Sequence, residues 1–108
     1  MGSWSLKPDG RFDYWSPETF VNFGFDPSKG IPTLTEMLTV VHPEDRDLMV
    51  KTTAKMRQGG VGCDFRYRII HPERGVRTMH SVGEAVVEDG RLVRFIGNTL
   101  GTSQNKSD

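Results

Sequence analysis

The chain has 108 residues, enough for one domain with a single hydrophobic core and too few for two. Fourteen Lys and Arg residues balance fourteen Asp and Glu residues, and this zero formal charge argues against nucleic acid or an anionic membrane surface as a partner. The single cysteine, Cys63, excludes an internal disulfide bond, so we expect a cytoplasmic domain, with membrane anchoring of its parent protein left open.

A hairpin is predicted at the start of the chain. Trp4 and Leu6 alternate with polar residues, Pro8-Asp9-Gly10 favours a turn, and Phe12 and Tyr14 resume the alternation. Two short antiparallel strands follow from this pattern.

A short helix is predicted next. Ser16 stands where a helix N-cap is needed, and Pro17 suits the first helical position. Trp15 and Phe20 have the spacing of a hydrophobic staple, and Gly24 is suited to end the helix in a left-handed conformation.

A second helix is predicted from a capping box, Thr33-Leu34-Thr35-Glu36. Its inner face follows the i, i+3, i+4, i+7 spacing and consists of Leu34, Met37, Leu38 and Val41.

A third helix is predicted from Pro43 to about Gln58, and Gly59-Gly60 ends it. His42 is interpreted as a capping or hinge residue before Pro43, and Asp45 as part of the same cap. The expected inner stripe consists of Leu48, Met49, Thr52 and Met56.

The second half of the chain reads as three antiparallel strands. Phe65, Tyr67 and Ile69 alternate with charged residues, which places them on one face of a strand, and Asp89-Gly90 is a strong two-residue hairpin signal. The order of strands and helices favours an α+β domain with helices on one sheet face. We assign residues 1–102 to this domain and 103–108 to a polar tail or truncated linker.

Several ordered stretches resemble the PAS sensory domains typical of bacterial sensor kinases. The resemblance covers roughly Trp4 to Thr99. It rests on Asp9-Gly10-Arg11-Phe12, Tyr14-Trp15-Ser16-Pro17, Phe23-Gly24-Phe25-Asp26-Pro27, His42-Pro43-Glu44-Asp45-Arg46, Tyr67-Arg68-Ile69, Gly75-Val76-Arg77 and Phe95-Ile96-Gly97.

The resemblance implies a five-stranded antiparallel sheet in the order 2-1-5-4-3, with helices packed across one face around a small cavity. It also implies a non-catalytic sensory role, relayed to a C-terminal effector of the same chain such as a histidine kinase or a cyclic-dinucleotide enzyme. One departure stands out: family members often end the last strand with Asp-Ile-Thr, whereas this chain has Gly101-Thr102-Ser103. That change predicts a softer, less rigid connection between the last strand and the effector that follows it.

A small organic ligand is the expected partner of the cavity, although packing of the core alone would explain the same apolar pattern. Alternation on the last strand points Phe95, Gly97 and Thr99 toward the helices, and a glycine inside a strand signals close approach of another group. The candidate lining consists of Phe20, Met37, Val41, Phe65, Tyr67, Ile69, Phe95, Gly97 and Thr99.

The sequence does not favour haem, flavin, a metal or catalysis. Flavin photochemistry in this family needs a helical cysteine, whereas Cys63 begins a strand, and Thr99 stands where flavin-binding members carry Gln. A haem ligand would have to come from three histidines, of which His42 is assigned to a cap, His71 to a solvated turn and His80 to either sheet face. No nucleophile and base pair or metal-ligand set can be assembled.

The outer sheet face is a candidate for homodimerisation or effector docking. Arg66, Arg68, Arg77 and Arg94 are expected there, with apolar area from Trp4 and Leu6. Cross-strand charge pairing is the competing interpretation. A docking module without a ligand is therefore kept as the alternative function.

Overall fold

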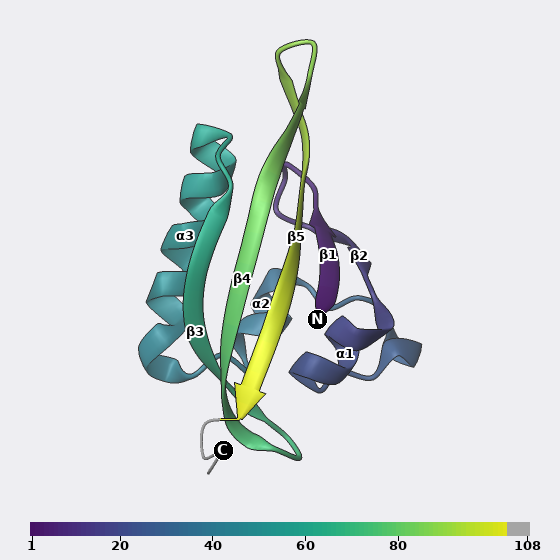
Figure 1. Ribbon diagram of the computed structural model, residues 1–108, viewed down its shortest axis with the longest axis vertical. Coiled ribbons are helices and arrows are strands. Elements are labelled where there is room, and N and C mark those ends of the chain that lie inside the picture. Colours follow the sequence, from purple (N-terminus) through teal and green to yellow (C-terminus); the bar gives the residue numbers. More distant parts are fainter. Residues whose placement is uncertain (104–108) are drawn as a thin grey trace.

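The computed structural model describes residues 1–103 and shows an antiparallel sheet with all its helices on one face (Figure 1). The spatial order of the strands is β2-β1-β5-β4-β3, which confirms the predicted fold class and topology. The remainder of the expected polar tail, residues 104–108, lies outside the described residues. The strands are β1 (Gly2–Leu6), β2 (Phe12–Trp15), β3 (Cys63–His71), β4 (Gly75–Glu88) and β5 (Arg91–Ser103).

The helices follow the predicted start and stop signals closely. The Thr33 and Glu36 capping box forms in both directions, and Gly24 adopts a left-handed φ of 83°. Ser16 precedes the first helix without a side-chain cap; its Oγ accepts instead from the Ser3 amide of β1. The elements are α1 (Pro17–Phe23), α2 (Leu34–Leu38), α3 (Arg46–Gly59) and the 3-10 turns η1 (Pro27–Lys29) and η2 (Pro43–Asp45). None of the described helices is long and apolar enough to cross a membrane.

The start of α3 and its inner stripe differ from prediction. His42 caps η2 by accepting the Glu44 amide, as expected, but the Asp45 side chain does not cap α3. Leu48 is 43% exposed, so its place in the inner stripe was wrong. The residues that α3 buries are Met49, Thr53 and Met56. Leu48 precedes Met49 by one residue, about 100° around the helix, and therefore faces away.

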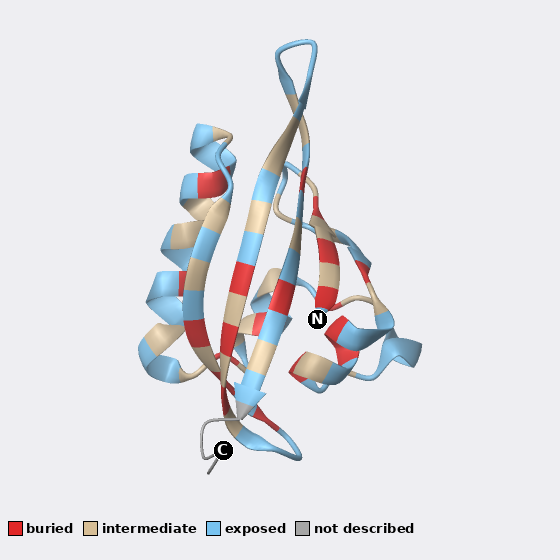
Figure 2. Ribbon diagram, in the orientation of Figure 1, coloured by how far each residue is buried: buried red, intermediate tan, exposed pale blue. Residues whose placement is uncertain are grey.

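The inner face of the sheet carries the core, as Figure 2 shows in the buried bands along β1, β4 and β5. Tyr67 and Ile69 on β3 and Phe95 on β5 are buried, as alternation predicts. Trp4 and Leu6 are buried on this face too. Their predicted position on the outer face was wrong, because β1 is a central strand whose apolar side has to meet the helices.

The hairpin of β4 and β5 extends beyond the rest of the sheet (Figure 1). Pairing of β4 with β3 ends at Gly83, and pairing of β5 with β1 ends at Phe95, so the remaining residues pair only with each other. Asp89 and Gly90 have positive φ values of 52° and 77°, as a two-residue primed turn requires. The predicted turn residues are confirmed.

Candidate functional site

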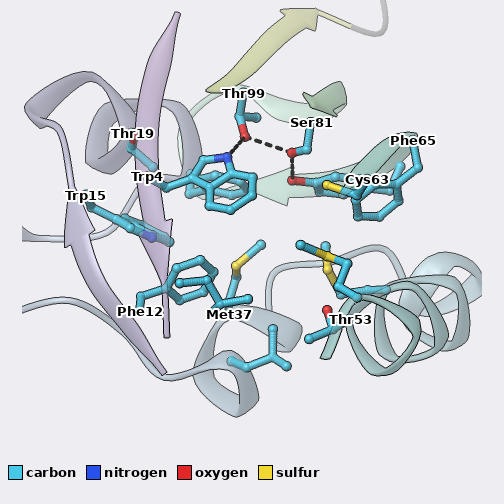
Figure 3. Close-up of a pocket in the computed structure, with 16 residues that line it drawn as sticks. Trp4, Phe12, Trp15, Thr19, Met37, Thr53, Cys63, Phe65, Ser81 and Thr99 are labelled. Atoms are coloured by element: carbon cyan, nitrogen blue, oxygen red, sulfur yellow. Dashed lines mark hydrogen bonds between the residues drawn. The ribbon is translucent and has the colours of Figure 1, made fainter. Parts of the chain in front are cut away.

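A small cavity lies between the inner sheet face and the helices (Figure 3). Its free volume is about 40 Å³, more than the roughly 10 to 15 Å³ that a cavity needs to hold one water molecule. No lining side chain carries a charge. The lining residues are Trp4, Leu6, Phe12, Trp15, Thr19, Phe23, Leu34, Met37, Met49, Thr53, Met56, Cys63, Phe65, Tyr67, Ser81 and Thr99.

A chain of hydrogen bonds forms the polar part of the sheet-side wall (Figure 3). Trp4 Nε1 donates to Thr99 Oγ1 at 3.0 Å, and Thr99 Oγ1 lies 2.7 Å from Ser81 Oγ. Ser81 Oγ in turn lies 2.8 Å from the Tyr67 hydroxyl. Burial raises the pKa of Tyr67, so its hydroxyl stays neutral. The wall is therefore polar but uncharged.

Two glycines allow the Trp4 ring to lie against the sheet. Gly97 pairs with both Trp4 and Gly83 across the strands, and a Cβ at either glycine would collide with the indole ring. The group that closely approaches Gly97 is thus a side chain of the protein itself. This position is the reason that the indole can reach Thr99.

The helix-side wall is built from flexible side chains. Met37 comes from α2, Met49 and Met56 come from α3, and all three are buried. Methionine is unbranched and adapts to irregular spaces at little cost. This wall can therefore rearrange more readily than the hydrogen-bonded sheet wall.

The expected lining residues divide into two groups. Met37, Phe65, Tyr67 and Thr99 lie on the cavity wall. The others lie in the surrounding core or, for Gly97, beneath the Trp4 ring; they are Phe20, Val41, Ile69, Phe95 and Gly97. Contact of any of them with a ligand stays a prediction.

Sequence reasoning did not identify Trp4, Trp15 or Ser81 as lining residues. Ser81 could have been found from strand alternation, because it pairs with Thr99 and points to the same face. Trp15 ends β2 and packs against α1, with its ring centroid 5.3 Å from that of Phe20, so the predicted hydrophobic staple is confirmed.

Cys63 contributes an unreactive thiol to the wall. It begins β3 and is partly buried. Burial raises its pKa to about 11, so the thiol stays protonated near neutral pH and is a weak nucleophile.

Among the described residues, the histidines and acids do not converge on a metal site. His71 is buried: Nε2 donates to the Val21 carbonyl at 3.0 Å, while Nδ1 accepts two amides of the following turn, so its predicted solvent exposure was wrong. His80 faces outward and bonds Asp64. No group of three or more potential metal ligands occurs within residues 1–103.

Two of the expected outer-face arginines make contacts that charge patterning did not predict. Arg77 is buried on the inner face and donates to the Asn22 carbonyl at the end of α1, so its outer placement was wrong.

Arg68 pairs with Asp45 through three hydrogen bonds of 2.7–2.9 Å. The Arg68 guanidinium lowers the pKa of Asp45 to about 2.

Gly101 continues β5 and pairs with Met79. A Cβ there would approach Met79 Sδ to 2.9 Å and Arg77 Nη2 to 3.1 Å. The glycine thus leaves room for two side chains that pack beneath the end of the last strand. Softer coupling at this point stays a prediction.

Comparison with known proteins gives one family. The sequence model of the family described as PAS fold matches residues 12–99. No curated protein sequence matches the chain.

Solved structures share the architecture. The N-terminal domain of a diguanylate cyclase with PAS/PAC sensor from Marinobacter aquaeolei is 24% identical, with 94% of each chain covered and a TM-score of 0.79. A sensory box histidine kinase/response regulator from Burkholderia thailandensis is 23% identical, with 94% of this chain and 76% of that chain covered and a TM-score of 0.70. A domain of the putative light and redox sensing histidine kinase from Haloarcula marismortui is 24% identical, with 93% of this chain and 87% of that chain covered and a TM-score of 0.76.

Proposed function

The chain belongs to the PAS fold family, and from that premise we propose that it is a non-catalytic sensory domain that binds a small molecule in its internal cavity. We further propose that it relays binding to an effector domain of the same cytoplasmic signalling protein, such as a histidine kinase. The solved structures that resemble it include parts of a histidine kinase and of a diguanylate cyclase.

The observation that carries this proposal is the asymmetry of the cavity walls. One wall is a sheet held by a hydrogen-bonded chain, and the other is lined by three methionines. Ligand pockets usually measure roughly 300 to 1,000 Å³, far more than the present free space of about 40 Å³. A ligand would therefore enter by displacing the methionine wall, and the resulting shift of α2 and α3 would be the primary response.

Thr99 offers a route from the cavity to the effector. Its hydroxyl belongs to the hydrogen-bonded wall, and its carbonyl accepts from Asn22 Nδ2 of α1 at 3.4 Å. Thr99 lies two residues before Gly101 on the last strand. A change at the wall would thus act on the strand that leads out of the domain.

A thermal-shift screen against metabolites tests this function. We expect at least one compound to raise the melting temperature, because a ligand that binds only the folded state stabilises it. Thr53→Leu, which adds volume at the cavity wall, should abolish that shift. Thr52→Leu, one residue away and off the wall, should retain it.

A second candidate is a docking or homodimerisation module without a ligand. It is favoured by exposed apolar side chains on the outer sheet face. Tyr14 on β2 and Ile96 on β5 pair with Ser5 from its two sides, and Val82 on β4 and Leu100 on β5 lie near them. A tight dimer in sedimentation, lost in Ile96→Glu, with no stabilising compound would favour this function over the sensory one.

A further inference from the structure

Trp15 lines the cavity, and its indole carries a buried hydrogen-bond donor that no described residue uses. The residue is 4% exposed, and its Nε1 is buried with no hydrogen-bond partner among the described residues. Its ring extends toward the cavity from β2 (Figure 3). The nearby rings of Phe20, Phe23 and Phe25 offer at most weak π acceptors. A buried donor without an acceptor is costly, so this position favours a molecule that supplies one.

Thr53 offers a second polar contact from the opposite side. It is buried on α3, and its hydroxyl faces the space between helix and sheet (Figure 3). Within residues 1–103 this hydroxyl makes no hydrogen bond to the protein. A hydroxyl can donate to the same kind of acceptor.

The remaining polar groups of the wall are already engaged. Thr99, Ser81 and Tyr67 bond one another, and Trp4 donates to Thr99. Thr19 donates to the Ser3 carbonyl. Among the described residues, the lining groups that remain without a partner are therefore Trp15 Nε1, which can only donate, and the Thr53 hydroxyl, which can donate or accept.

The lack of charge on the wall restricts the ligand further. An ion moved into an apolar space without a partner loses hydration that nothing replaces. All lining side chains are uncharged, and the raised pKa values of Cys63 and Tyr67 keep both groups neutral. Carboxylates, phosphates and ammonium ions are therefore disfavoured.

We propose that the cavity selects an uncharged, mainly apolar molecule with a hydrogen-bond acceptor, such as a ketone or an ether, whose oxygen accepts from Trp15 Nε1. This ligand class rests on the proposed sensory function. It differs from a generic apolar pocket, which would bind a hydrocarbon of the same shape equally well.

Three probes of one size separate these possibilities: cyclohexanone, its isostere methylenecyclohexane, which lacks the acceptor, and cyclohexylammonium, which carries a charge. The chain has two tryptophans, so a ¹H–¹⁵N correlation spectrum shows two indole signals. Cyclohexanone should move the Trp15 indole proton downfield, while the Trp4 proton, already bonded to Thr99, serves as the internal reference. We expect the ketone to bind about 3- to 10-fold more tightly than the hydrocarbon, the factor for one net hydrogen bond, and the ammonium ion not to bind.

Two variants identify the groups responsible. Trp15→Phe should remove the preference for the ketone while retaining binding of the hydrocarbon, and its spectrum also assigns the indole signal. Thr53→Val keeps the shape of the side chain and should reduce the same preference in part, which provides an answer if Trp15→Phe does not fold.

Different failures point to different conclusions. Equal affinity for ketone and hydrocarbon, or binding of cyclohexylammonium, overturns the ligand class and leaves the sensory function standing. The series is repeated on Met56→Ala, which enlarges the space. If no probe binds either protein, the ligand class is overturned as well, whereas the sensory function is contradicted only if the metabolite screen also gives no stabilising compound.

Discussion

At the scale of single residues, the pairing of Asp45 with Arg68 makes stability depend on pH. The pKa of Asp45 is about 2 in the folded protein, against an ordinary value of 3.8. The lowered pKa means that the pair stabilises the fold fully above the ordinary value, and that this contribution is lost as the pH falls toward 2. Because Arg68 is partly exposed, solvent screening limits the contribution to about 1 to 2 kcal/mol.

Asp45→Asn should therefore lower the free energy of unfolding at pH 7 by about 1 to 2 kcal/mol, and the difference from the parent should shrink between about pH 4 and pH 2. Urea unfolding at several pH values measures this. Asp47→Asn is the matched control, because Asp47 pairs with Lys51 at the exposed surface. A difference for Asp45→Asn that is constant down to pH 2 would contradict the assignment.

At the scale of elements, His71 attaches α1 to the turn between β3 and β4. Its ring bonds the Val21 carbonyl and the amides of Glu73 and Arg74. His71→Ala leaves these groups unsatisfied and should cost about 2 to 3 kcal/mol of unfolding free energy. His80→Ala, which removes an outer-face contact to Asp64, should cost less than about 1 kcal/mol. Equal losses in chemical denaturation would refute the structural role of His71.

The elements also show which features a sequence can reveal. Alternation predicted the inward faces of β3 and β5, and turn chemistry predicted the β4–β5 hairpin, because both depend on local periodicity. The burial of Arg77 depends instead on a tertiary contact, because its partner is a carbonyl at the end of α1. The same holds for His71, which a turn position alone suggested was solvated. Trp15 Nε1 could not be found in advance, since an unsatisfied donor is defined by everything that surrounds it.

At the scale of the whole molecule, Trp4 joins the two halves of the chain. Its ring lies 6.3 Å from that of Phe12 in the first hairpin, and it covers Gly83 and Gly97 and bonds Thr99 in the last two strands. Trp4→Ala should cost about 3 to 5 kcal/mol in unfolding free energy, in the range for large aromatic core residues. Tyr14→Ala on the same hairpin should cost far less, because Tyr14 is half exposed. Thermal and urea unfolding compare the two; similar losses would mean that Trp4 does not join the halves.

The projecting end of the β4–β5 hairpin has a practical consequence. Glu88, Asp89, Gly90 and Arg91 are exposed, and within residues 1–103 this ribbon pairs with no further strand. Extra residues at an exposed loop tip add little closure entropy and disturb few contacts. A fluorescent reporter inserted between Asp89 and Gly90 would thus leave the cavity intact while remaining covalently continuous with β5, the strand that carries Thr99. The tip is a suitable position from which to read out events in the core of the domain.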